Sequence, residues 1–251
     1  MKTYLYDSGL EEMMMEKKTE KKMTQEEIMK LLDKLYAQSV NGLAKVSPPI
    51  EVLAEDYLQK SKNIDAAARK FINYQVMKCA TSGFVTGLGG LITLPVSIPA
   101  NIGSVMYVQM RMIACLAYMG GYDTGSDQVQ TLVYACLAGI SIDQVLKNVG
   151  IQFGTKLTTS MIRKIPGTVL TKINQRVGFR FLTKFGTKGI INLGKAVPVV
   201  GGVIGGGFDF AETKAIANRA YAMFIKGNLE TLPHDPNDAD DIPTVEVEII
   251  E

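Results

Sequence analysis

Residues 82–123 read SGFVTGLGGLITLPVSIPANIGSVMYVQMRMIACLAYMGGYD, and this stretch decides the fold class. Lys78 and Arg111 bracket 32 consecutive uncharged residues. A single straight transmembrane helix needs only ~20 apolar residues, so the length of the run alone is compatible with the bilayer. Its glycines and prolines argue against one uninterrupted helix.

Pro95 and Pro99 divide this apolar run. Each removes a helical hydrogen bond, so we expect two arms, residues 79–94 and 97–119. The first arm would be ~24 Å long at 1.5 Å per residue, which is short for a ~30 Å hydrocarbon core. The pattern therefore predicts a helical hairpin, which either enters one leaflet of a membrane or forms the centre of a soluble bundle.

Glycines four residues apart mark this run and a second apolar stretch near the C-terminus. Small residues at this interval share a helix face and let two backbones approach closely, which matters most in lipid. Because glycine in a helix costs up to ~1 kcal/mol in water, close packing should offset it. The candidate helix-packing glycines are Gly83 with Gly87, Gly201 with Gly205, and Gly202 with Gly206.

The remaining sequence also predicts helices. Thr24 with Glu27 forms a capping-box signature, and GGYD at 120–123 is a stop signal. Only TVEVEII at 244–250 is strand-like. We predict an all-α, multi-helix bundle with two glycine-rich apolar helical hairpins. The expected helices span 24–40, 47–60, 63–84, 126–138 and 141–163; Pro166 then opens another, shorter helical pieces reach Gly194, and a last helix spans 197–226.

Charge divides the chain into a basic body and an acidic tail. Eight of the 25 acidic residues and no lysine or arginine lie in residues 230–251, so the rest holds 27 basic and 17 acidic side chains. We expect a flexible charged N-terminus at 1–23, a helical domain at 24–229 and an acidic C-terminal tail at 230–251. Ten basic and no acidic residues lie between Asp143 and Asp209, which points to a polyanionic partner.

The basic residues of this region alternate with apolar ones, as in MIRKIPGTVLTKINQRVGFRFLTKFG at 161–186. Such a face suits an anionic membrane surface. A solvated face without a partner stays open, whereas nucleic acid is disfavoured because no DNA- or RNA-binding motif accompanies the charge. The candidate membrane-surface residues are Lys172, Arg176, Phe179, Arg180, Phe181 and Lys184.

The chemistry-bearing residues do not form a recognisable catalytic pattern. The single histidine, His234, lies in the acidic tail, where a rigid nucleophile–base pair is hard to build. The three cysteines match no metal motif, and the glycine runs lack the lysine and serine or threonine of a nucleotide loop. We therefore expect no catalytic residue, no metal and no cofactor.

Three residues of the apolar segments are candidates for a structural or ligand-lining role. Arg111 is the first charge after the long run, and a buried arginine needs a partner. Asp209 is the first acid after the basic region, so we predict an Arg111–Asp209 pair that joins the hairpins. Gln109 precedes Arg111 by two residues and points in a different direction.

Two blocks, GFVTGLGGLITLPVSIPANIGSVMYVQMRMIACLAYMGGYD (83–123) and KAVPVVGGVIGGGFDFAETKAIANRAYAMF (195–224), resemble the EcsC family in sequence, order and separation. The resemblance covers roughly residues 25–229. It implies a bacterial, cytosolic or membrane-associated protein with a link to transport, and no established reaction. Members of the family often carry an aspartate where this chain has Asn101, so Asn101 joins the ligand-lining candidates.

These observations favour a non-enzymatic, membrane-associated helical protein at the cytosolic membrane face, peripheral or monotopic. Its expected partners are the anionic membrane surface and a membrane protein complex. The alternative is an enzyme that acts on a lipid or other apolar substrate in a helical cavity lined by Arg111, Gln109 and Asp209. A third class, a nucleic-acid binder, rests on the basic charge alone.

Overall fold

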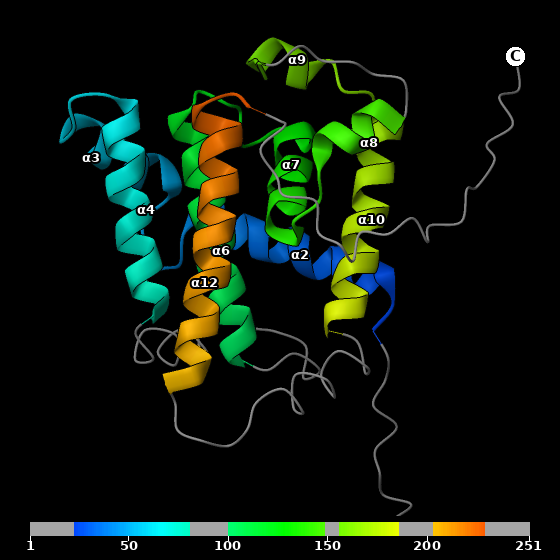
Figure 1. The fold of residues 1–251 in the computed structure, drawn as a ribbon, viewed down its shortest axis with the longest axis horizontal. Coiled ribbons are helices and arrows are strands. Elements are labelled where there is room, and N and C mark those ends of the chain that lie inside the picture. Colours follow the sequence, from blue (N-terminus) through cyan, green and yellow to red (C-terminus); the bar gives the residue numbers. More distant parts are fainter. Residues whose placement is uncertain (1–22, 81–99, 149–155, 186–202, 229–251) are drawn as a thin grey trace, which may run out of the picture.

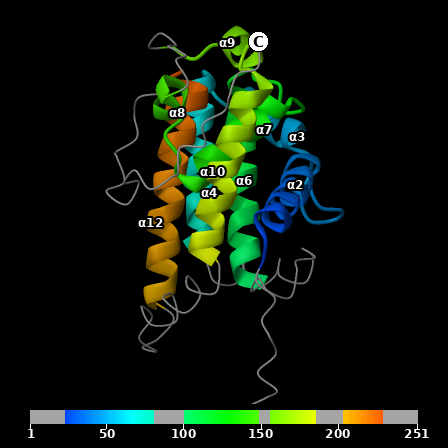
Figure 2. The same ribbon diagram turned by 90° about the vertical axis from the view of Figure 1, so that its right-hand side faces the viewer.

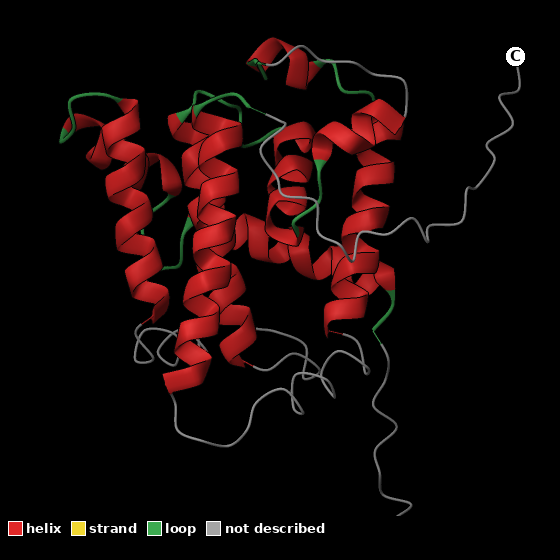
Figure 3. Ribbon diagram, in the orientation of Figure 1, coloured by secondary structure: helices red, strands yellow, loops and turns green. Residues whose placement is uncertain are grey.

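The computed structural model describes residues 23–80, 100–148, 156–185 and 203–228, and every regular element in these ranges is helical (Figures 1 and 3). The predicted all-α bundle is therefore confirmed for the described residues. The elements are α2 (Gln25–Asn41), α3 (Ile50–Gln59), α4 (Ile64–Ala80), α6 (Ala100–Met119), α7 (Asp127–Ala138), α8 (Ile142–Asn148), α9 (Thr159–Arg163), α10 (Gly167–Phe185), α12 (Val203–Ala220) and the π-helical turn η1 (Tyr221–Ile225).

Helix α6 is the centre of the bundle. From Met106 to Ala117 its side chains are buried on every side, including the large Tyr107 and Met110. A helix that is apolar all round must be enclosed, and α2, α3, α4, α7 and α12 surround this one. The described part of the second predicted arm is thus covered by protein.

The long helices α4 and α10 run in one direction along the bundle, and α6 and α12 run in the opposite direction. Helices α4 and α10 finish, and α6 and α12 begin, at the same end of the molecule (Figures 1 and 2). We call this the open end, and the opposite one, where α6 and η1 finish, the capped end. The chain reverses direction between residues 80 and 100 and again between 185 and 203, as two hairpins require.

Helix α12 packs against both α4 and α6. Gly205 and Gly206 lie near the start of α12. Most of the first arm lies outside the described residues, together with Gly83, Gly87, Gly201 and Gly202. The close glycine packing therefore stays a prediction.

Local signals set several helix ends as expected. The Thr24 hydroxyl accepts a hydrogen bond from the Glu27 N–H at 3.1 Å, and the Glu27 carboxylate accepts one from the Thr24 N–H at 2.8 Å. Helix α7 begins after the Ser126 cap and ends at Gly139, whose φ of 75° is left-handed. The stop after Met119 is confirmed as well, because Gly121 has φ 80°.

The structure tests the limits of three further expected helices. The helix predicted at 141–163 is wrong as one element: α8 ends at Asn148, and Thr158 caps a separate α9. The helix expected to open at Pro166 is confirmed as α10, of 19 residues, and the shorter pieces expected up to Gly194 lie outside the described residues from 186 onward. The last helix is described from Val203 and changes from α to π winding at Tyr221. Core packing against α2 and α7 overrides the weak helix propensity of its glycine and threonines in α10.

Within the described ranges, no individual helix has the length and hydropathy that crossing a membrane requires. One sharply bent pair, α7 with α8 at 116°, meets the same criteria when the two are taken together.

Candidate functional site

Arg111 is buried, with 5% of its surface exposed, and it fastens the α2–α3 connection to α6. Its guanidinium donates to the carbonyl oxygen of Ser39 at 2.7 Å and to that of Pro48. Nearby, the Tyr107 and Ser47 hydroxyls are 2.7 Å apart. Because Ser39 lies in the last turn of α2, its carbonyl has no partner within the helix, and the arginine supplies one.

The predicted partner of Arg111, Asp209, lies on α12, and its side chain is outside the described residues. Gln109 is the residue of α6 that reaches α12: its side-chain amide donates to the Thr213 hydroxyl at 3.0 Å, and both residues are buried. The two candidates therefore face different neighbours, as their spacing predicts. Asn101 lies in the first turn of α6, and its side chain is likewise not described.

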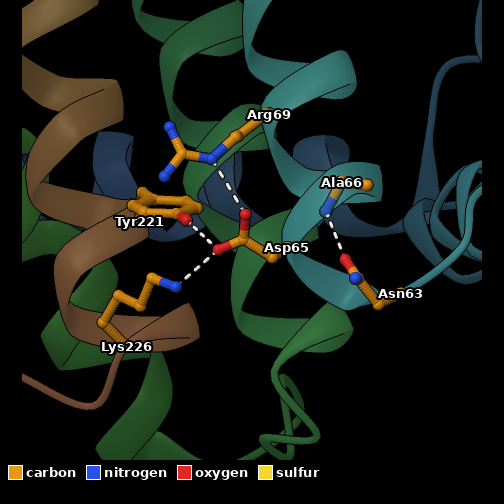
Figure 4. Close-up of polar contacts among 6 residues, drawn as sticks. All are labelled: Asn63, Asp65, Ala66, Arg69, Tyr221 and Lys226. Atoms are coloured by element: carbon orange, nitrogen blue, oxygen red, sulfur yellow. Dashed lines mark hydrogen bonds and ion pairs between the residues drawn. The ribbon is translucent and has the colours of Figure 1, made fainter.

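A polar cluster that the sequence reasoning missed joins the start of α4 to η1 at the capped end (Figure 4). One oxygen of the Asp65 carboxylate accepts from the Tyr221 hydroxyl and from the Lys226 ammonium, the latter at 2.5 Å. The other oxygen accepts from Arg69 at 2.9 Å. We call these four residues the Asp65 cluster. The i, i+4 spacing of Asp65 and Arg69 was readable in advance, but nothing local connects them to residues 221–226.

The electrostatics of the Asp65 cluster favour a structural role over a catalytic one. The hydrogen bonds from Lys226, Tyr221 and Arg69 hold the pKa of the Asp65 carboxyl well below its ordinary value of 3.8. Its hydrogen bond to Asp65 raises the pKa of Lys226 in turn. A carboxylate with three donors on its two oxygens is a poor general base. The Arg69 guanidinium also lies 4.8 Å from the centre of the Tyr221 ring, which it covers.

Backbone contacts complete the capped end. The Leu157 N–H donates to the Gly227 carbonyl at 2.6 Å, and the Tyr122 hydroxyl donates to the Leu157 carbonyl at 3.1 Å. Gly120 is so close to η1 that an added Cβ would lie 2.1 Å from the Phe224 carbonyl oxygen. The end of α6, η1 and the segment around Leu157 that precedes α9 are therefore held together.

The described residues offer little reactive chemistry. None of their histidine, cysteine or carboxylate groupings could hold a metal ion. Burial raises the pKa of both Cys115 and Cys136 to about 12, so neither is a thiolate nucleophile at neutral pH. Arg111 and Gln109 already use protein partners, which gives them a structural role in this fold.

The α10 basic face is the surface formed by Lys172, Arg176, Phe179 and Arg180. Their spacing places them on one side of α10, with Lys172 exposed, both arginines partly exposed and the Phe179 ring 53% exposed. Phe181, predicted on the same surface, is only 5% exposed and belongs to the core, because it lies half a turn away. The Lys184 side chain lies outside the described residues.

A second surface of similar composition lies on α4, which is on the opposite side of the molecule from α10 in Figure 1. Tyr74 and Met77 are 50% and 68% exposed, and the Lys78 ammonium lies 4.5 Å from the centre of the Tyr74 ring. We call these three residues the α4 face. Tyr74 and Phe179 each lie six residues before the end of their helix, or ~9 Å from the open end.

Comparison with known proteins gives one match. The model of the EcsC protein family matches residues 10–226, most of the chain, and begins within the segment predicted as a charged N-terminal extension. No curated protein and no solved structure matches the chain.

Proposed function

For this chain, which belongs to the EcsC protein family, we propose a non-enzymatic role at the cytosolic face of a bacterial membrane, with the open end of the bundle directed toward the lipid. The proposed partner is an anionic membrane surface. In this orientation Tyr74 and Phe179 would lie at the level of the lipid headgroups, and Lys172, ~10 Å farther along α10 than Phe179, would lie within about a Debye length of that level.

The observation that carries the proposal is the position of exposed apolar and cationic side chains. Membrane interfaces favour tyrosine and lysine, because each combines an apolar body with a polar or charged tip. Phenylalanine beside cationic residues is also typical of helices that lie at the interface. Here Tyr74 and Phe179 lie on opposite sides of one end of the bundle, each ~9 Å from the end of its helix. A membrane that meets the bundle end-on would contact both faces at once.

The sequence at the open end supports the same orientation. The residues that join α4 to α6 are uncharged from 81 to 99, and those that join α10 to α12 include VPVVGG at 197–202. Both join helix ends that lie at the open end. The acidic groups of the Asp65 cluster lie at the capped end, away from this surface, whereas Glu26 and Glu27 at the start of α2 lie close to α10, because the neighbouring Gln25 donates to the Gln175 carbonyl.

Vesicle flotation of the full chain tests this proposal. We expect binding to vesicles that contain phosphatidylglycerol and weaker binding to phosphatidylcholine alone, because each cation near an anionic surface contributes ~1 kcal/mol. High salt should weaken the electrostatic part. A chain that floats with neither vesicle at low salt would overturn the proposal.

Two variants test the end-on orientation. Tyr74→Ser with Met77→Ser changes only the α4 face, and we expect it to reduce flotation, whereas a membrane lying flat on α10 would not contact that face. Val52→Ser is the matched control, because Val52 is 56% exposed on α3 and lies outside both faces. Equal losses in the double variant and the control would contradict the orientation.

Charge variants separate specific from general electrostatics. We expect Lys172→Gln, Arg176→Gln and Arg180→Gln together to weaken binding to anionic vesicles about tenfold or more. The matched control removes the same charge at Lys45, Lys60 and Lys62, three exposed lysines outside the two faces. If both triple variants lose the same affinity, net charge and not the α10 basic face determines binding.

A further inference from the structure

The described chain leaves the bundle beside the start of its basic region. Gly227 accepts a hydrogen bond from the Leu157 N–H at 2.6 Å, so the two chain segments lie side by side at the capped end. Leu157 follows the exposed Lys156 and precedes α9 by two residues. The first acid of the C-terminal tail, Glu230, is three residues beyond Gly227.

Five basic residues lie in the sequence between Lys156 and Arg176, beginning next to Leu157. Within the described ranges none of them forms an ion pair, and all are exposed or partly exposed. Lys156 precedes Leu157, Arg163 ends α9 and Lys164 follows it, and Lys172 and Arg176 lie on α10. We call this set the tail-facing cations: Lys156, Arg163, Lys164, Lys172 and Arg176.

We infer that the acidic tail, residues 230–251, binds the tail-facing cations. The tail carries eight acidic and no basic residues, and the region from 144 to 208 carries basic and no acidic ones, so their charges are complementary. Its 22 residues can span ~70 Å when extended, whereas α10 is only ~28 Å long. The tether also gives the tail a high effective concentration at a surface that begins at its own exit point.

This inference has a regulatory consequence that rests on the proposed function. Lys172 and Arg176 belong both to the tail-facing cations and to the α10 basic face. A bound tail therefore competes with anionic lipid for these two cations and lowers the affinity of the chain for the membrane. Whether the tail or anionic lipid binds these two cations would depend on the ionic strength and on the amount of anionic lipid.

Zero-length carbodiimide crosslinking of the full chain tests the docking itself. The reagent joins a carboxylate to a lysine amine in direct contact, and mass spectrometry of the monomeric fraction identifies the joined residues. We expect crosslinks from residues 230–251 to Lys156, Lys164 and Lys172, and their loss at high salt. Crosslinks distributed equally to Lys60, Lys62 and Lys70, or absent from both sets, would overturn the inference.

A second variant separates this inference from the proposed function. Changing the eight tail acids to their amides should remove the crosslinks and strengthen binding to anionic vesicles about tenfold, because two cations become available. Crosslinks in the natural chain with no vesicle binding by either protein would contradict the membrane role and leave tail docking intact. Unchanged vesicle affinity in the amide variant would overturn the competition.

Discussion

The two ends of the bundle are built differently. At the capped end, the Asp65 cluster, the Leu157–Gly227 hydrogen bond and the close approach of Gly120 to Phe224 hold α4, α6, α9 and η1 together. At the open end, the α4 face and the α10 basic face expose Tyr74, Met77 and Phe179. Among the described residues, the contacts that hold these helices together therefore lie at the capped end, whereas the exposed apolar and cationic side chains lie nearer the open end.

Arg111→Met should have the largest effect on stability. Arg111 lies in the half of α6 nearer the capped end, and its removal leaves the buried Ser39 carbonyl and the partly buried contact at the Pro48 carbonyl without this donor. We expect a loss of about 4 kcal/mol in the free energy of unfolding, measured with urea, since each unsatisfied buried group costs ~1–3 kcal/mol. Arg163→Met, at an exposed arginine with no ion pair among the described residues, is the control and should change stability by less than ~0.5 kcal/mol. Similar values for both would contradict the assigned role.

Gly120→Ala should destabilise the capped end by about 3 kcal/mol. The new methyl group would overlap the Phe224 carbonyl oxygen, so the end of α6 and η1 would have to separate. Gly167→Ala is the matched control, because nothing lies within 4 Å of a Cβ at that position. The same urea titration should find the control unchanged or slightly more stable. A tolerated Gly120→Ala would show that this end is less tightly packed than its contacts indicate.

Asp65→Asn should lower the midpoint of thermal unfolding at neutral pH and remove part of its pH dependence. The pKa of Asp65 is lowered in the folded state, so its stabilising effect is fully present above the ordinary value of 3.8 and is lost as the pH falls through the folded value. The difference between natural chain and variant should therefore be constant from about pH 7 to pH 5 and shrink below about pH 4. Circular dichroism melts across this range measure it. A difference that does not change with pH would mean that charge contributes nothing there.

Phe179→Ser should have the smallest effect on stability and a clear one on membrane binding. Because the Phe179 ring is 53% exposed, the free energy of unfolding should change by less than ~0.5 kcal/mol. Flotation with anionic vesicles should decrease. Phe181→Ser is the informative contrast, since Phe181 is buried and its loss should instead destabilise the fold by ~3 kcal/mol. If Phe179→Ser unfolds the chain, the open end is not the free surface described above.

Local sequence signals predicted much of the fold. The Thr24 capping box, the Ser126 cap and the glycine stops at 121 and 139 depend on residues within one turn of each other, so they are readable before the tertiary structure is known. The apolar run likewise predicted that α6 would be either central or in contact with lipid. Its described part is central because five other helices surround it.

Contacts between distant segments could not be predicted in the same way. Asp65 meets Tyr221 and Lys226 across 156 and 161 residues, and the donors of Arg111 meet two backbone carbonyls that no side-chain pattern marks. The surface assignment of Phe181 was wrong for a related reason: counting aromatics among basic residues ignores the helical angle that separates Phe179 from Phe181. Such partners depend on how helices pack, which the sequence gives only indirectly.

The wider winding of η1 sets the register of everything after it. Lys226 N–H donates to the carbonyl of Tyr221, five residues earlier, so this turn contains one residue more than an α-helical path would use. If the same residues wound as α-helix instead, Lys226 would rotate by about 100° relative to Tyr221. Lys226 would then no longer reach Asp65, and the chain after it would point in another direction. The extra residue in this turn therefore determines the direction in which the chain leaves η1.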